Sequence, residues 1–189
     1  GRVTLVDQRL FHVWKPSLHE VAAGTLDIHQ EGLSYLMLAH DNGFDFVFGP
    51  LKGLDADAHW ILVGAVGDEN DELIIPERRI TYGSLVIAVG STANYFGIPG
   101  AAEHALALNG PHDAERFRLR MLKAMTMADL KKTTDPDAGL DIVIIGGGAT
   151  GVELAAELRE ASKVLGNYGL HRLQPDADVR LTLLESAPR

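Results

Sequence analysis

Three glycines and two glutamates have the types and spacing that could do chemistry in this sequence. Gly146, Gly148 and Gly151 form the pattern G-x-G-x-x-G, between apolar residues 142–145 and a stretch of helical character at 152–165. In a strand–loop–helix unit the first glycine allows a tight turn, the second lets a pyrophosphate approach, and the third lets helix and strand pack closely. The N–H groups that begin the helix then face the phosphates. The pattern predicts a dinucleotide site, with a purely structural glycine turn as the alternative.

A second predicted strand, residues 179–184, ends in Glu185. An acid at this position accepts hydrogen bonds from ribose hydroxyls and disfavours a 2′-phosphate, which predicts NADH rather than NADPH. Its separation from Gly151 is longer than usual (185 − 151 = 34 residues). We therefore expect residues 166–178, with Gly169 and Pro175, to form an insertion that absorbs the excess.

Glu153 follows the glycine pattern, in what we expect to be the first turn of the helix. Two interpretations of this carboxylate stay open. It could lie where the far end of a bound nucleotide passes, or it could only interact with the positive end of the helix dipole. The residues by themselves favour the second interpretation.

The composition excludes several other kinds of site. A net charge of −9, with no basic stripe, argues against a nucleic-acid surface. The chain has no cysteine, so disulfides, thiolate nucleophiles and cysteine-ligated metals are excluded within it. The eight histidines show no zinc-type spacing, and we expect no metal site. No apolar run approaches the roughly 18 residues that a membrane span needs.

The remaining pattern predicts an α/β fold. Residues 2–7 predict a strand ending in Asp7, the same arrangement as residues 179–185. We therefore expect two Rossmann-like units, the first lacking its first strand and the second represented by only its first β-α-β. Other expected elements are a helix at 31–40 with Leu33, Leu36 and Met37 on one face, a strand at 44–51, an inserted antiparallel β-meander at 59–66, 72–75 and 79–82, a buried strand at 85–89, a helix at 113–131 with core methionines, and a linker at 133–139. Residues 142–145, four consecutive β-branched residues, predict a strand buried on both faces.

The order of these elements resembles the two-dinucleotide flavoprotein reductases, and among them most closely the type II NADH dehydrogenases, which are single-subunit NADH:quinone oxidoreductases. The resemblance is carried by residues 11–24 (FHVWKPSLHEVAAG), 100–108 (GAAEHALAL) and 146–158 (GGGATGVELAAEL). It covers nearly all of this chain and under half of such an enzyme. The first glycine loop of the family would precede Gly1, and its second flavin motif and membrane-associating region would follow Arg189. We therefore interpret the chain as a fragment, and expect it to be inactive by itself.

The resemblance implies FAD as a second cofactor. It assigns the FAD adenosine ribose to Asp7, the loop beside the flavin to Lys15 and Pro16, the adenine contact to Leu51, and a segment near FAD to Ala88, Val89 and Gly90. Val89 stands where the family has threonine, so a hydroxyl contact would be lost and this match is weaker. The resemblance also assigns NADH to Gly146, Gly148, Gly151 and Glu185, and it strengthens the catalytic interpretation of Glu153 as a residue near nicotinamide and flavin.

The missing cysteines distinguish among the related reductases. Glutathione-reductase-like, thioredoxin-reductase-like and sulfide:quinone reductases all carry cysteines in regions that this chain covers, and it has none. A disulfide or sulfide reductase is therefore disfavoured.

The resemblance leads us to expect an FAD-dependent NADH dehydrogenase that passes electrons to a quinone. Alternatives are an NADH oxidase or ferredoxin-reductase-like flavoprotein, and a flavin-free nucleotide-sensing or structural module. We expect a partial FAD-binding domain at 1–110, a connecting helix and linker at 111–139, and the start of an NADH-binding domain at 140–189. The implied location is cytoplasmic and peripheral on the inner face of the cytoplasmic membrane. A homodimer or further chain would have to complete residues 1 to about 100.

Overall fold

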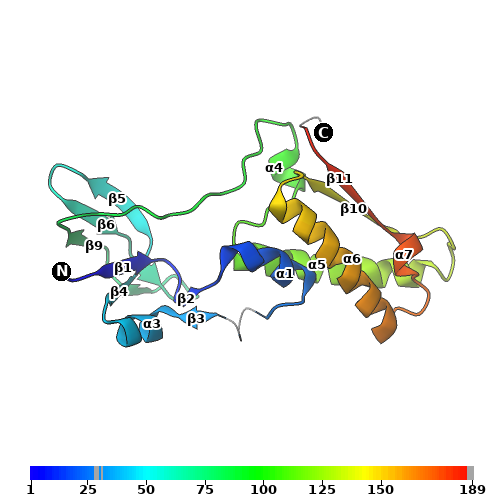
Figure 1. Cartoon of the computed structure of the whole chain (residues 1–189), viewed down its shortest axis with the longest axis horizontal. Coiled ribbons are helices and arrows are strands. Elements are labelled where there is room, and N and C mark those ends of the chain that lie inside the picture. Colours follow the sequence, from blue (N-terminus) through cyan, green and yellow to red (C-terminus); the bar gives the residue numbers. More distant parts are fainter. Residues whose placement is uncertain (28–29, 31, 187–189) are drawn as a thin grey trace. The chain divides into compact units, whose positions relative to one another are not determined.

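A computed structural model describes residues 1–27, 30 and 32–186 of the chain (Figure 1). The fold is mixed α/β. The chain packs as two compact units. Unit 1 comprises Gly1–Val13 and Gly32–Gly90, and unit 2 comprises Trp14–Glu31 and Ser91–Arg189.

Asp7 is the last residue of one strand of a parallel pair, at the Asp7 end of unit 1. Strand β1 (Thr4–Asp7) pairs with β4 (Asp45–Phe48), and Asp7 lies opposite Phe48. The connection between them contains the short antiparallel pair β2 (Phe11–His12) and β3 (Leu33–Ser34), followed by helix α3 (Tyr35–Asn42). The Tyr35 ring stacks on the Phe46 ring at 5.2 Å, which packs the start of α3 against β4.

The helix expected at 31–40 is partly wrong. Glu31 lies outside the described residues, residues 33–34 form β3, and α3 begins only at Tyr35. Leu33, Leu36 and Met37 are 55%, 61% and 66% exposed, so they form no core stripe. The cause is that residues 33–34 pair with β2, and the small Ala39 is the helix residue that becomes buried.

An antiparallel sheet forms the rest of unit 1. Its three strands run in the order β5 (Leu51–Asp55), β6 (Trp60–Val63) and β9 (Arg78–Thr81). A small hairpin, β7 (Val66–Gly67) with β8 (Leu73–Ile75), connects the last two. Ile61 and Val63 are buried, and the Arg79 guanidinium lies 4.2 Å from the centre of the Trp60 ring. The strands predicted at 59–66, 72–75 and 79–82 overlap β6 and β7, β8, and β9, whereas β5 was not predicted.

The strand predicted at residues 85–89 is wrong. This segment has no regular structure, and Val86, Ile87 and Val89 are 86%, 57% and 74% exposed. A strand needs a neighbour for its backbone N–H and C=O groups, and the sheets of the described residues do not include this segment. An apolar sequence was therefore not sufficient to make a buried strand here.

Three helices pack together in unit 2. Helix α1 (Leu18–Ala23) contacts both α5 (Pro111–Lys131) and α6 (Ala149–Tyr168). Met121 and Met125, one turn apart on α5, are buried, as are Leu154 and Leu158 on α6. The core role predicted for Met121 and Met125 is confirmed, and so is the helix predicted at 113–131.

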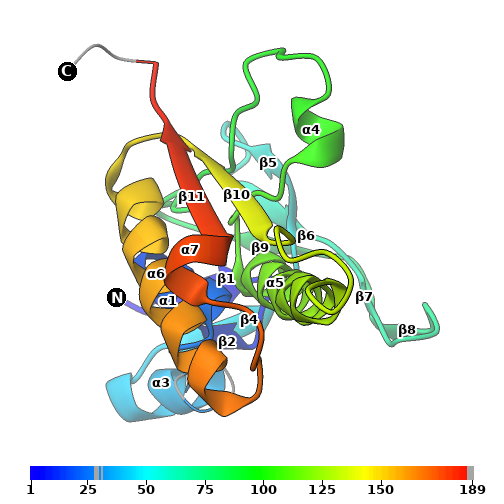
Figure 2. The ribbon, with the colours of Figure 1, turned by 90° about the vertical axis from the view of Figure 1, so that its right-hand side faces the viewer.

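A two-stranded parallel sheet completes unit 2 (Figure 2). Strand β10 (Leu140–Ile145) pairs with β11 (Val179–Leu184), with α6 and the short α7 (Pro175–Asp178) between them in sequence. Ile144 is buried on the side that faces the helices, whereas Val143 and Ile145 are 56% and 71% exposed. The prediction that β10 is buried on both faces is wrong, because the described residues cover only one face of this sheet. The predicted linker, residues 133–139, joins α5 to β10 inside unit 2.

Candidate functional site

The three glycines of the loop differ in backbone conformation and in the space beside them. Gly146 has φ +112°, a conformation that residues with a side chain rarely adopt. At Gly148 a β-carbon would meet none of the described atoms within 4 Å, which leaves open space beside the backbone. At Gly151 a β-carbon would clash with the carbonyl oxygen of Gly146. The helix and the loop can therefore approach this closely only because Gly151 has no side chain. The loop thus has a tight turn, an accessible backbone and a close contact.

Helix α6 begins directly after this loop. Gly148 is its N-cap residue and has no side chain that could cap the first N–H groups. These groups and the positive end of the helix dipole favour a negatively charged group beside the loop. The local geometry fits a phosphate-bearing ligand.

Glu185 reaches the glycine loop despite its long sequence separation. Its Oε2 atom accepts a hydrogen bond from the Gly147 N–H at 2.6 Å, and its Oε1 atom accepts one from the Ser186 N–H at 2.6 Å. Glu185 therefore contacts the glycine loop at Gly147, between the predicted residues Gly146 and Gly148. The role of these residues in binding NADH remains a prediction.

The insertion predicted at 166–178 is tied to α5 by a buried carboxylate. Asp129 is 5% exposed, and it accepts hydrogen bonds from the N–H groups of Arg172 (2.7 Å) and Leu173 (2.9 Å). These bonds and the Arg172 guanidinium hold the pKa of Asp129 below its ordinary value. The carboxylate therefore fixes the middle of the insertion.

An ion pair holds the end of the same insertion. Lys132 Nζ lies 2.9 Å from Asp178, and both side chains are about nine-tenths buried, at 13% and 14% exposure. Burial would raise the pKa of Asp178, but the Gln174 N–H and the Lys132 ammonium lower it overall. Because β11 begins at the next residue, this pair sets where the strand that carries Glu185 starts.

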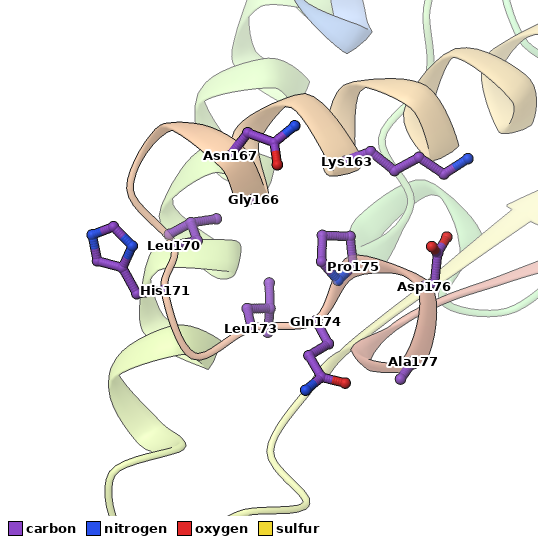
Figure 3. Close-up of a pocket in the computed structure, with 10 residues that line it drawn as sticks. All are labelled: Lys163, Gly166, Asn167, Leu170, His171, Leu173, Gln174, Pro175, Asp176 and Ala177. Carbon is purple, nitrogen blue, oxygen red and sulfur yellow. The ribbon is translucent and has the colours of Figure 1, made fainter.

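A depression of about 590 Å³ lies over the insertion (Figure 3). Leu170, Leu173 and Pro175 point toward its middle, and Gln174 points away. Pro175 packs so closely on Gly166 that a β-carbon there would lie 2.7 Å from its ring. The depression follows from this packing at the C-terminal part of α6, whereas the glycine loop precedes the N-terminus of the same helix. We assign it no ligand.

Glu153 lies in the second turn of α6, not in the first as predicted. The helix begins at Ala149, and its first turn contains no acidic residue. The dipole effect falls off within the first turn, so the purely electrostatic explanation of Glu153 loses support. Its Oε2 atom instead lies 3.6 Å from His19 Nδ1 on α1. His19 was not singled out from the sequence, because only the packing of α1 on α6 brings the two residues together.

The Asp7 carboxylate lies at the end of β1. It accepts hydrogen bonds from the Arg9 N–H (2.8 Å) and the Tyr35 hydroxyl (3.4 Å). Burial and the negative charge of Asp7 raise the pKa of Tyr35, so this hydroxyl remains a donor at neutral pH. Asp7 is thus held in place at the position predicted for a ribose contact.

The other residues predicted beside FAD are distributed over both units. Leu51 begins β5 and is 42% exposed, while Ala88, Val89 and Gly90 belong to the irregular exposed segment of unit 1. Lys15 and Pro16 form the 3-10 turn η1 (Lys15–Ser17) in unit 2, where Lys15 Nζ donates to the Ser91 carbonyl. Lys15 and Pro16 therefore share a unit with Glu153 and the glycine loop.

No cluster of three or more histidine, aspartate or glutamate side chains within residues 1–27, 30 and 32–186 could hold a metal ion. In the same described part of the chain, no helix has the length and apolarity required to cross a bilayer.

A parallel β-α-β unit whose glycine loop meets an acid after the second strand defines an α/β fold of the FAD/NAD(P)-binding oxidoreductase kind. Residues 1–189 match the family described as Pyridine nucleotide-disulphide oxidoreductase, and the chain belongs to this family. It is 33% identical over 202 residues to the Type II NADH:quinone oxidoreductase of Haemophilus influenzae, with 100% of this chain and 45% of the relative covered. It is 29% identical over 192 residues to the External NADH-ubiquinone oxidoreductase 2, mitochondrial, of Saccharomyces cerevisiae, with 98% and 34% covered.

The fold is also similar to a solved structure of NDH2 from Plasmodium falciparum in complex with RYL-552. The TM-score is 0.77 at 21% identity, and the match covers 97% of this chain and 36% of that one. The chain spans less than half the length of the curated relatives it matches.

Proposed function

We propose that the chain is part of a longer FAD-dependent NADH dehydrogenase that passes electrons to a quinone. The observation that carries this proposal is the contact between Glu185 and the glycine loop at Gly147, in a chain with relatives named as NADH:quinone and NADH-ubiquinone oxidoreductases. An acid at this place favours ribose hydroxyls over a 2′-phosphate.

On the NADH side, the backbone at Gly148 and the N-terminus of α6 would hold the pyrophosphate. Glu185 would accept hydrogen bonds from the adenosine ribose. Glu153 would position the nicotinamide or handle a proton. The open space at Gly148 and the uncapped helix N-terminus support this assignment.

On the FAD side, Asp7 would hold the adenosine ribose, Leu51 the adenine, and Lys15 and Pro16 the flavin edge. The segment of Ala88, Val89 and Gly90 would lie near the same cofactor. Bound FAD would supply the chemistry, because it accepts hydride from NADH and passes electrons on. The supporting observation is the carboxylate of Asp7 at the end of a parallel strand.

The finer architecture is also a proposal. Residues 1–110 would form part of an FAD-binding Rossmann-like domain with an inserted antiparallel meander, and residues 140–189 would begin the NADH-binding domain, with 111–139 between them. The first strand of the FAD domain would come from outside this chain. The exposed apolar segment at 85–89 supports this, because it is a strand-forming sequence without a strand partner.

The location of the enzyme follows from the proposed acceptor, and its assembly from the exposed segment of unit 1. Quinones dissolve in the bilayer, so an enzyme that reduces them works at a membrane surface, here the cytoplasmic face through a region outside this chain. A homodimer remains a second way to cover the exposed segment of unit 1. Co-sedimentation of the full-length protein with vesicles and analytical ultracentrifugation test these two points.

The test is NADH oxidation by the purified full-length protein with a water-soluble quinone, compared with oxygen alone. The proposal expects a yellow protein whose turnover depends on the quinone. Turnover that needs only oxygen, or only a ferredoxin, would assign it to another class of flavoprotein. A colourless protein that binds nucleotide without oxidising it would support the flavin-free module.

A further inference from the structure

His19 lies between two parts of the proposed reaction centre, the turn at Lys15 and Pro16 and the carboxylate of Glu153. It is on α1, where Leu18 and Val21 on the same helix are 2% and 1% exposed. The His19 side chain itself is 12% exposed. A ring that is held in this way has few alternative orientations.

The hydrogen-bond partner of His19 fixes the position of its proton. The Nδ1 atom lies 2.8 Å from the Pro16 carbonyl oxygen. A carbonyl oxygen can only accept, so the proton of the neutral ring is on Nδ1. The Nε2 atom is then the acceptor of the ring.

Two carboxylates flank this ring. Glu153 Oε2 lies 3.6 Å from Nδ1, and Glu20 Oε1 lies 3.8 Å from Nε2. The Nδ1 proton is donated to the Pro16 carbonyl, and Glu153 Oε2 at 3.6 Å is too far from Nδ1 for a hydrogen bond. The Glu153 carboxylate therefore lies near the positive N–H end of the ring, whereas the Nε2 lone pair is on the side of Glu20. The neutral ring therefore attracts the Glu153 carboxylate and not the Glu20 carboxylate.

We propose that His19 is a positioning residue for Glu153. The positive N–H end of its ring, held in place by the Pro16 carbonyl, attracts the Glu153 carboxylate and keeps it near the turn that carries Lys15. Glu153 is 52% exposed and on a helix surface, so without such a partner its side chain would sample several rotamers. This inference rests on the proposed function, in which the orientation of Glu153 matters to the nicotinamide.

A second polar contact between the same helical segments provides a control. Thr25 Oγ1, just after α1, donates to Glu157 Oε2 at 3.2 Å, and Glu157 is one turn along α6 from Glu153. Glu157→Gln removes a negative charge one turn along α6 from Glu153 and keeps an oxygen that can accept from Thr25, so the contacts of His19 and Glu153 are left unchanged. Glu157→Gln is therefore matched to Glu153→Gln.

The first experiment needs no turnover. Ring-nitrogen NMR shifts of the ¹⁵N-histidine-labelled full-length protein report the tautomer, and the spectrum of His19→Asn identifies which signals belong to His19. We expect the neutral ring to be the Nδ1–H tautomer, with signals that shift in Glu153→Gln and are unchanged in Glu157→Gln. An Nε2–H tautomer, or a His19 signal indifferent to Glu153, would overturn the inference.

The second experiment separates positioning from structural support. His19→Leu should lower kcat about tenfold or more while KM for NADH changes less than about twofold, because misplacement of a reacting group lowers the rate. His19→Asn keeps an N–H donor near the Nδ1 position and should restore most of the rate. In the Glu153→Gln background, His19→Leu should cause no further loss.

The outcomes distinguish the two proposals. Additive losses for His19→Leu and Glu153→Gln, or an equal loss in Glu157→Gln, would overturn the positioning role while NADH oxidation stands. A protein that does not oxidise NADH but shows the expected NMR shifts would refute the proposed function and leave the His19–Glu153 pairing supported.

Discussion

The Oε2 atom of Glu185 accepts a hydrogen bond from the Gly147 N–H at 2.6 Å. The end of β11 and the loop after β10 are therefore in direct contact, although 38 positions separate the two residues. This contact places a negative charge where a nucleotide ribose would approach the loop.

Replacing that charge should change the choice of nucleotide. Glu185→Gln removes the charge that repels a 2′-phosphate and keeps an oxygen for the Gly147 N–H. We expect the ratio of kcat/KM for NADPH to that for NADH to rise about tenfold, a free-energy difference of about 1.4 kcal/mol. Steady-state kinetics with both nucleotides measure it.

The control for this change is Glu160→Gln, on the exposed side of α6 and paired with Lys163. It should leave the ratio unchanged. A wild-type protein that oxidises NADPH as well as NADH would contradict the assignment of Glu185.

Alanine at two glycines of the loop should have different effects. At Gly151 the added methyl clashes with the Gly146 backbone, so Gly151→Ala should lower the free energy of unfolding by about 1–3 kcal/mol, as overpacking does. At Gly148 the methyl enters open space, so Gly148→Ala should keep its stability and lose NADH affinity. Urea unfolding and NADH titration on both variants make the comparison. Equal stability of the two variants would show that the close approach at Gly151 is not needed.

Asp129 predicts a pH dependence of stability. The pKa of Asp129 is lower in the folded protein than the ordinary value of 3.8. A lowered carboxyl pKa stabilises the folded state above the ordinary value, and this stabilisation is lost as the pH falls through the folded value. Asp129→Asn should therefore reduce the urea midpoint most near pH 7, with a difference from wild type that shrinks below about pH 4.

The exposed Asp137→Asn serves as the reference for that series. A difference between wild type and Asp129→Asn that is constant from pH 7 to pH 3 would exclude the charge as the cause.

Glu153→Gln tests the candidate catalytic residue. The amide keeps the size of the side chain and removes its charge and its ability to take a proton. We expect kcat for NADH oxidation to fall about 10²-fold, the lower end of what a proton-handling residue contributes. Stopped-flow mixing with NADH shows whether the loss is in flavin reduction. A rate within a factor of two of wild type would leave Glu153 without a catalytic role.

Residues 1–189 alone should not retain flavin. Val86, Ile87 and Val89 are exposed, and the segment 88–90 proposed to lie near FAD has no regular structure. Flavin absorbance of the purified 189-residue chain is the measurement, with the full-length protein as reference. Stoichiometric FAD in the short chain would contradict the proposal that its FAD domain is incomplete.

The sequence predicted elements whose partners are close along the chain. The β10–loop–α6 unit and α5 are specified by local signals, namely a β-branched run, three spaced glycines and buried methionines one turn apart. The same local reasoning failed at residues 85–89 and at the outer face of β10, because burial there depends on neighbours that the local sequence does not reveal. His19 was missed for a similar reason: its relation to Glu153 exists only once α1 packs on α6.

Two anchors hold the insertion in place, so the start of β11 does not depend on how many residues the insertion contains. Asp129 fixes residues 172–173, and the ion pair of Lys132 with Asp178 fixes the start of β11. Residues 169–171, between the end of α6 and Arg172, take part in neither anchor. Natural length variation, or a deliberately inserted peptide tag, should therefore be tolerated at this turn without displacing Glu185 from the glycine loop.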